Sequence, residues 1–202
     1  MKRVLAFVAV LFMGLSAIFA DEYVISKVDC MAADGLYDRE LTFKYDDEDN
    51  VYYICRSTYS AVYWFTLTPA KLEKLRANLN KVQEWSKLAK ENKASISKEL
   101  PDSKISVEGT MKRGNDWYST RWNIDINFFF VSQVNEESEI ISLLLRGGEE
   151  ESRQNEFVDI EFESVVFLNN EIDSLINAIS NETIEAAKSK HSQEKTTSDL
   201  FN

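Results

Sequence analysis

Within residues 118–131 the even positions from 122 to 130 are apolar, and this alternation limits the fold more than any other feature. The apolar members are the even positions Trp122, Ile124, Ile126, Phe128 and Phe130, and the polar members are Arg121, Asn123, Asp125 and Asn127. A period of two places these groups on opposite faces of a strand. Because one face is apolar and the other is suited to water, the strand belongs in an antiparallel sheet.

Further strands are predicted at residues 41–45, 51–55, 63–67, 105–111, 140–145, 158–162 and 165–168. A long amphipathic helix is predicted to start at Thr68 and Pro69, which suit an N-cap and a first helical turn, and to end near Asn92. A second, shorter helix should start at Asn169 or Asn170. The predicted fold class is therefore α+β: an antiparallel sheet of about six to eight strands with one long and one shorter helix packed on one face.

Residues 1–20 have the composition of a secretory signal peptide. Lys2 and Arg3 precede an apolar run, which is followed by small residues and an abrupt acidic start at Asp21. The run is shorter than the roughly 20 apolar residues that span a bilayer, so cleavage near Ala20 is favoured over an anchor. We expect a signal peptide at 1–20, a single α+β domain at 21–190 and a flexible polar tail at 191–202. The expected localisation is periplasmic or secreted.

The charge balance narrows the range of partners. Loss of Lys2 and Arg3 from the 23 basic residues leaves 21 against 34 acidic ones, a net charge near −13. Nucleic acids and anionic membrane surfaces are bound through basic footprints, so no nucleic-acid partner is expected. The mature chain has no second long apolar run, so no integral membrane segment is expected there either. A protein or an envelope component remains a possible partner.

The chain has two cysteines, Cys30 and Cys55. In an exported protein an even pair is most simply interpreted as one disulfide. Closing a loop of about 26 residues would stabilise the fold by roughly 3.5 kcal/mol in the chain-entropy model. The alternative is two separate buried thiols.

Residue types used in catalysis are scarce. His191 is the only histidine and is expected on the surface near the end of the last helix, which argues against histidine-based triads and multi-histidine metal sites. No phosphate loop or nucleophile elbow is present, and no cofactor or metal site is predicted. Carboxylates are plentiful, and the strand acids that a hydrolase could use are Glu108, Asp125, Asp159 and Glu161. No catalytic residue is assigned.

Clustered aromatic residues are the remaining candidates for a binding site, namely Tyr52, Tyr63, Trp64, Trp117 and Tyr118. Neighbouring aromatics on a strand point to opposite faces, so some must leave the main core. Exposed tyrosine and tryptophan are favoured at interfaces, whereas a second small core is the structural alternative.

These observations favour an exported, non-catalytic binding module that engages a partner through a sheet face or edge. One alternative is a carrier of a small apolar ligand, which requires an enclosed cavity. The less favoured alternative is a carboxylate-dependent envelope hydrolase, which requires two facing acids and a raised pKa.

Overall fold

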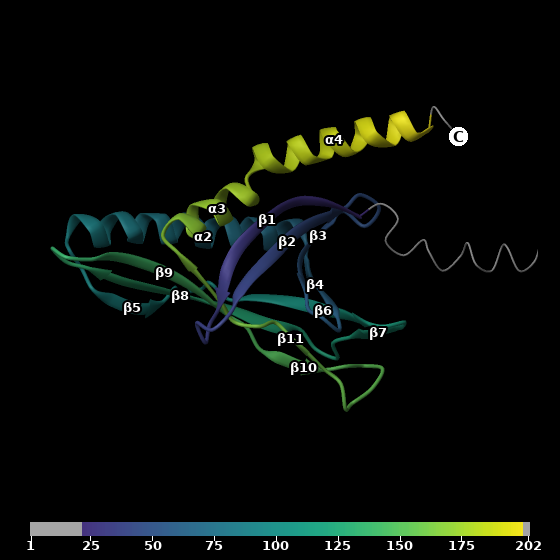
Figure 1. Ribbon diagram of the computed structural model, residues 1–202, viewed down its shortest axis with the longest axis horizontal. Coiled ribbons are helices and arrows are strands. Elements are labelled where there is room, and N and C mark those ends of the chain that lie inside the picture. The colour runs from purple at the N-terminus through teal and green to yellow at the C-terminus, as the bar shows by residue number, and fades with distance from the viewer. Residues whose placement is uncertain (1–21, 200–202) are drawn as a thin grey trace, which may run out of the picture.

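The computed structural model describes residues 22–199, so the predicted signal peptide lies outside the described residues. The described chain forms twelve strands and three helices (Figure 1). Four strands precede the long helix, namely β1 (Glu22–Ala32), β2 (Asp38–Asp46), β3 (Val51–Ser57) and β4 (Val62–Leu67). An acidic turn separates β2 from β3. After helix α2 (Pro69–Glu91) come β5 (Ile96–Glu99), β6 (Ile105–Arg113), β7 (Asp116–Ser119), β8 (Ile124–Val134), β9 (Glu139–Arg146), β10 (Glu149–Glu151), β11 (Asp159–Glu161) and β12 (Val165–Leu168). Helices α3 (Asn170–Ala178) and α4 (Asn181–Asp199) end the described chain.

The main sheet closes on itself. Its order is β5-β8-β9-β12-β1-β2-β3-β4-β6-β7, and a further pairing of β6 with β8 joins the two sides. The eight strands from β8 round to β6 therefore form an antiparallel barrel, with β5 and β7 as extra strands. A separate ribbon, β10–β11, lies on the side away from α2 (Figure 1).

The prediction of an open sheet with helices packed on one face is wrong, because β8 is shared between three neighbours. Residues Ile124 and Ile126 of β8 lie opposite Val107 and Ile105 of β6. Further along, the same strand pairs with β9 over residues 127–134 and with β5 over residues 129–132. Alternation within one strand gives the same pattern in an open sheet and in a barrel, so only this long-range pairing distinguishes the two.

The barrel centre is filled by side chains. Phe65, Phe128, Phe130 and Phe167 are all less than 2 % exposed, and α2 adds Leu72, Leu75, Leu79 and Val82. Helix α2 begins as predicted, with the Thr68 hydroxyl accepting a hydrogen bond from the Lys71 amide at 3.4 Å and Pro69 in the first turn. Its buried stripe contacts β3, β4, β6, β8 and β9.

The last predicted helix is two helices. Helix α3 ends at Ala178, and α4 begins at Asn181 after a break at Ile179 and Ser180. Helix α4 continues to Asp199, through residues for which the sequence predicts a polar tail. Strand β1 pairs with β12 only at Met31 and Ala32. Both helices contact β1, and the Ser26 hydroxyl of this strand donates to the Ala178 carbonyl at the end of α3 at 3.0 Å. The helices thus cover strand β1 where it leaves its neighbour.

The predicted strand at 118–131 is interrupted. Ile124, Ile126, Phe128 and Phe130 are buried as the alternation indicates. Trp122, the first apolar member of the pattern, lies in a bend between β7 and β8 and is 71 % exposed. A change of strand at 120–123 ends the alternation, and this boundary carries no glycine or proline that would mark it in the sequence.

Candidate functional site

The five predicted binding aromatics do not form one surface. Tyr52 is buried in the barrel, where its ring lies 4.7 Å from that of Tyr45. Tyr63 and Tyr118 are half-buried against the same core. These three side chains therefore contribute mainly to packing.

Trp64 and Trp117 come together on the outside of the barrel wall, with ring centroids 5.3 Å apart. They pack with Tyr53 and Cys55 in a small second core, the structural alternative that the sequence left open. The Trp64 indole donates to the Glu22 carboxylate at 3.2 Å, and this carboxylate also pairs with Lys44. In this outer cluster Tyr53, Cys55 and Trp64 are buried, and Trp117 is half-buried.

The two cysteines are free, buried thiols, so the predicted bridge is absent from the structure. Cys30 lies opposite Arg39 and Cys55 lies opposite Thr42, both on β2. Arg39 and Thr42 are an odd number of positions apart and therefore face opposite sides of the strand. Cys30 consequently belongs to the barrel core, whereas Cys55 belongs to the outer cluster.

Thiol titration tests this arrangement. Burial raises the pKa of Cys30 to about 12 and also raises that of Cys55. At pH 8 the reactive thiolate of Cys30 is therefore only about one part in ten thousand. Ellman's reagent should leave both thiols unreacted in the native protein and titrate two in guanidinium without reductant. Fewer than two thiols in denaturant would demonstrate a bridge.

An apolar row crosses the outer face of the sheet. Strand register aligns Met31 of β1 with Val166 of β12, Val166 with Leu144 of β9, and Leu144 with Phe129 of β8. At the two ends of the row, Met31 lies opposite Asp38 and Phe129 lies opposite Glu99. We call the six residues Asp38, Met31, Val166, Leu144, Phe129 and Glu99 the acid-flanked row.

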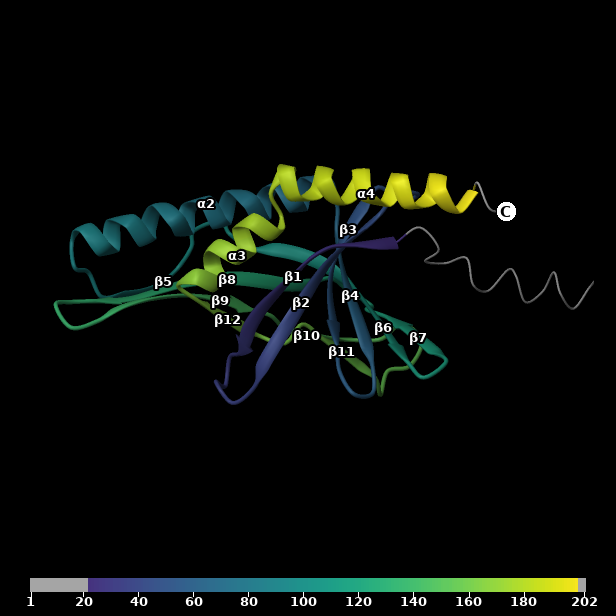
Figure 2. The same cartoon turned by 45° about the horizontal axis from the view of Figure 1, so that its top comes forward.

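All four apolar members of the acid-flanked row face away from the barrel core. Their sequence neighbours, such as Phe128, Leu143, Leu145 and Val165, are buried inside, while the row itself is half-buried. Val131 and Leu168 flank Ser142 in the parallel row beside it. Figure 2 places α2 above β8 and β9, and no described helix lies on the opposite side of these strands.

Sequence reasoning missed this row, although a signal for it was present. The segments 128–131, 143–145 and 165–168 are apolar at consecutive positions. A strand of this kind is apolar on both faces. Consecutive apolar residues identify strands with two apolar faces, but they do not show that these strands are neighbours in the sheet.

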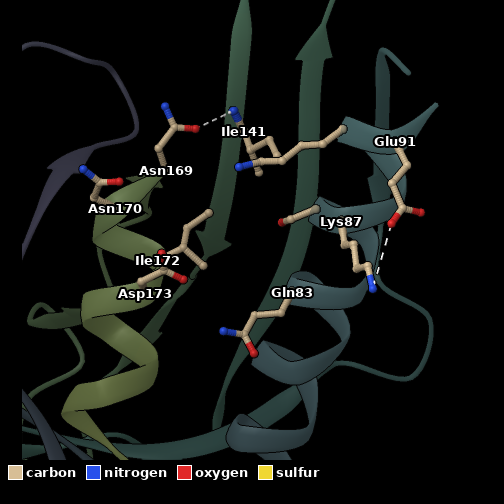
Figure 3. A pocket seen from close by; sticks show the side chains of 10 residues that line it. Gln83, Lys87, Glu91, Ile141, Asn169, Asn170, Ile172 and Asp173 are labelled. Atoms are coloured by element: carbon tan, nitrogen blue, oxygen red, sulfur yellow. Dashed lines mark hydrogen bonds and ion pairs between the residues drawn. The ribbon is translucent and has the colours of Figure 1, made fainter. Parts of the chain in front are cut away.

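A polar cleft lies between α2 and the start of α3 (Figure 3), with a volume of about 370 Å³. Gln83, Lys87 and Glu91 line one wall, and Asn169 and Asp173 line the other. The Asn169 side chain accepts a hydrogen bond from the Ile141 amide at 2.9 Å, which ties α3 to β9. Lys87 faces Glu91 at 3.9 Å, so the cleft holds opposed charges and no histidine or cysteine.

Of the four strand acids, Asp125 and Glu108 are engaged in ion pairs, whereas Asp159 and Glu161 of β11 lie opposite Glu151 and Glu149 of β10. Asp125 accepts from Lys104 at 2.9 Å and from the Ser106 hydroxyl, and these hydrogen bonds lower its pKa. Glu108 pairs with Arg153 at 3.2 Å. His191 lies in α4 with its ring stacked 4.2 Å from that of Tyr23. Among residues 22–199 there is no cluster of three or more metal-ligating side chains.

One cluster of charged side chains links strands of the barrel. Glu163, between β11 and β12, receives two hydrogen bonds from Arg39 at 2.7 and 2.9 Å and a third from Arg56. The Arg56 guanidinium also lies 4.8 Å from the Tyr63 ring centroid. The bonds from Arg39, together with the charge of Arg56, lower the pKa of Glu163. This arginine–glutamate cluster joins β2 and β3 to the segment before β12.

Comparison with protein-family models, curated proteins and solved structures gives no match. Over residues 22–199, no helix is both long enough and apolar enough to cross a membrane. The acid-flanked row is the candidate site because of its geometry alone.

Proposed function

We propose that this chain is an exported, non-catalytic binding module that engages a protein partner through the acid-flanked row. The observation that carries the proposal is the alignment of four outward-facing apolar side chains on adjacent strands, with a carboxylate at each end. Apolar surface rimmed by polar groups is characteristic of interaction sites.

The geometry of the row specifies the partner's chemistry. Strand spacing of about 4.8 Å gives the apolar part a length of about 14 Å and separates Asp38 from Glu99 by about 24 Å along the sheet. A matching partner has an apolar strip with a basic group on each side.

A second copy of this chain is a poor partner. Two rows facing each other would oppose carboxylate to carboxylate at both ends, and the exported domain carries a net charge near −13. Like charges at an interface cost several kcal/mol. The row therefore favours a basic partner over self-association.

Export is part of the same proposal and rests on the composition of residues 1–20. The acidic surface of the exported domain suits a role that avoids nucleic acids and anionic membrane surfaces. The carrier alternative gains no support from the barrel interior, where Phe65, Phe128, Phe130 and Phe167 occupy the centre.

Site-specific photocrosslinking in cells that produce the protein tests the proposal. A benzophenone side chain at Leu144 is expected to yield an adduct of discrete mass with the form that begins near Asp21. The same probe at Thr66, a half-buried position on the outer face of β4, should yield none. Reversing the charges with Asp38→Lys and Glu99→Lys should reduce the adduct at least about tenfold, because both ends would repel a basic partner.

Three results would contradict the proposed function. They are the absence of an adduct at Leu144, equal adducts at Leu144 and Thr66, and an adduct that charge reversal leaves unchanged. A crosslinked chain that retains residues 1–20 would contradict export alone and leave the row intact as a binding surface.

A further inference from the structure

A second surface feature lies on the opposite side of β5, between this strand and the C-terminal half of α2. It is a groove of about 330 Å³ lined by Trp85, Leu88, Ala89, Asn92, Ala94, Ile96 and Lys98. Strand β5 contributes to both features because its residues alternate. Ile96 and Lys98 line the groove, whereas Glu99 belongs to the acid-flanked row.

The groove wall is apolar and open. Leu88 is 54 % exposed and Ile96 is 42 % exposed, which is unusual for two large aliphatic side chains that line the same depression. Trp85 is held from below by Phe130, edge to face, with ring centroids 5.7 Å apart. The indole therefore forms a fixed floor, which suits a flat or extended apolar ligand.

Two ammonium groups lie over the Trp85 ring, and one of them belongs to Lys98, which lines the groove. Lys81 and Lys98 place their Nζ atoms 6.0 and 5.8 Å from the Trp85 ring centroid. Within the described chain, neither has a carboxylate partner within ion-pair distance. Other lysines of the same helix region are neutralised: Lys87 pairs with Glu91, Lys90 with Glu139 and Lys93 with Glu136. The positive charge left uncompensated in this region is thus concentrated at the groove.

We propose that this groove binds a small anionic amphiphile, an alkyl chain ending in a carboxylate. The carboxylate binds the ammonium groups of Lys81 and Lys98 at the Trp85 ring, and the chain extends from there along Leu88 and Ile96. The groove volume is at the lower end of the range for small-ligand sites, which fits a medium-length chain. Charge complementarity selects the anion in a domain whose overall charge would otherwise repel it.

Calorimetric titration of the protein with decanoate, below its micelle concentration, tests the inference. Saturable binding of one decanoate per chain is expected, with no matching binding of decyltrimethylammonium. The double variant Lys81→Gln/Lys98→Gln should weaken decanoate binding at least about tenfold, because both ammonium groups are lost. The matched control Lys87→Gln/Lys90→Gln removes two paired lysines from the same helix and should leave the affinity unchanged.

The apolar contribution has its own variant. Leu88→Asp places a carboxylate on an exposed position of the groove and should abolish decanoate binding while circular dichroism remains native. Absence of decanoate binding would overturn the proposal, and so would equal loss in the test and control double variants. Binding to phosphatidylglycerol vesicles without binding to free decanoate would also overturn it and assign the groove to a membrane surface. None of these results depends on the protein partner of the acid-flanked row.

Discussion

Replacing Gly147 by alanine should destabilise the protein by about 3 kcal/mol or more, whereas the same change at Gly148 should be tolerated. A Cβ atom at Gly147 would lie 1.9 Å from the Phe162 carbonyl oxygen and 2.5 Å from its ring. The oxygen belongs to the backbone, so no change of rotamer relieves the contact. A Cβ atom at Gly148 would meet nothing nearer than Ile124, at 4.0 Å.

The predicted effect at Gly147 is large because Phe162 is part of the barrel core. Its side chain is 2 % exposed and packs edge to face on Phe65, with ring centroids 4.8 Å apart. Its amide donates to the Gly148 carbonyl at 2.9 Å. Moving Phe162 to admit a methyl group would therefore disturb both packing and a backbone hydrogen bond.

Urea unfolding of the two variants measures the difference. Both substitutions restrict the unfolded chain in the same way, so the comparison isolates the contact in the folded state. The unfolding midpoint of Gly147→Ala should fall well below that of Gly148→Ala. Equal midpoints would mean that residues 147 and 162 approach less closely than the structure indicates.

Replacing Glu163 by glutamine is the second change with a large expected effect, a loss of about 3 kcal/mol at pH 7. Glu163 is the shared carboxylate of Arg39 and Arg56, and the Arg56 side chain is only 10 % exposed. Neutralising the carboxylate leaves two guanidinium groups facing each other with no counter-charge. Glu156→Gln, on the exposed loop before β11, is the matched control and should have no measurable effect.

The same residue makes a pH-dependent contribution to stability. Because the pKa of Glu163 is lowered in the folded protein, the unfolded chain takes up the proton first as the pH falls. The contribution is complete above the ordinary glutamate pKa of about 4.3 and is lost as the pH falls through the lowered value. Wild-type protein should therefore lose more stability between pH 7 and pH 3 than Glu163→Gln does. Urea unfolding at both pH values measures the two losses of stability. Identical losses in wild type and Glu163→Gln would show that the arginine–glutamate cluster does not cause the pH dependence.

Local structure followed from local sequence wherever neighbouring residues determined it. The helix from Pro69 to Glu91 was predictable because Thr68 supplies the cap and the apolar stripe has helical spacing. The hairpin formed by β2 and β3 was predictable because an acidic turn separates an alternating run from a continuous run of apolar and aromatic residues. In each of these elements the deciding interactions lie within a few residues of one another.

The candidate sites could not be predicted in this way. The acid-flanked row takes its apolar residues from positions 31, 129, 144 and 166, which become neighbours only through strand register. The groove combines a helix with a four-residue strand that shows little pattern of its own. Of the aromatic residues that the sequence indicated, Tyr52 and Trp64 are buried, and the other three are half-buried against one of the two cores.

By itself, the sequence determined the export-like composition of residues 1–20, the acidic charge, the inward face of β8 and the long helix. Tertiary structure alone decided that β6 meets β8 to close a barrel, that Cys30 and Cys55 lie on opposite sides of its wall, and that four distant apolar residues form one row. The physical reason is that alternation assigns a side chain to a face but does not name the neighbouring strand. Long-range pairing determines which strands are neighbours, and the acid-flanked row consists of residues from strands that are distant in the sequence.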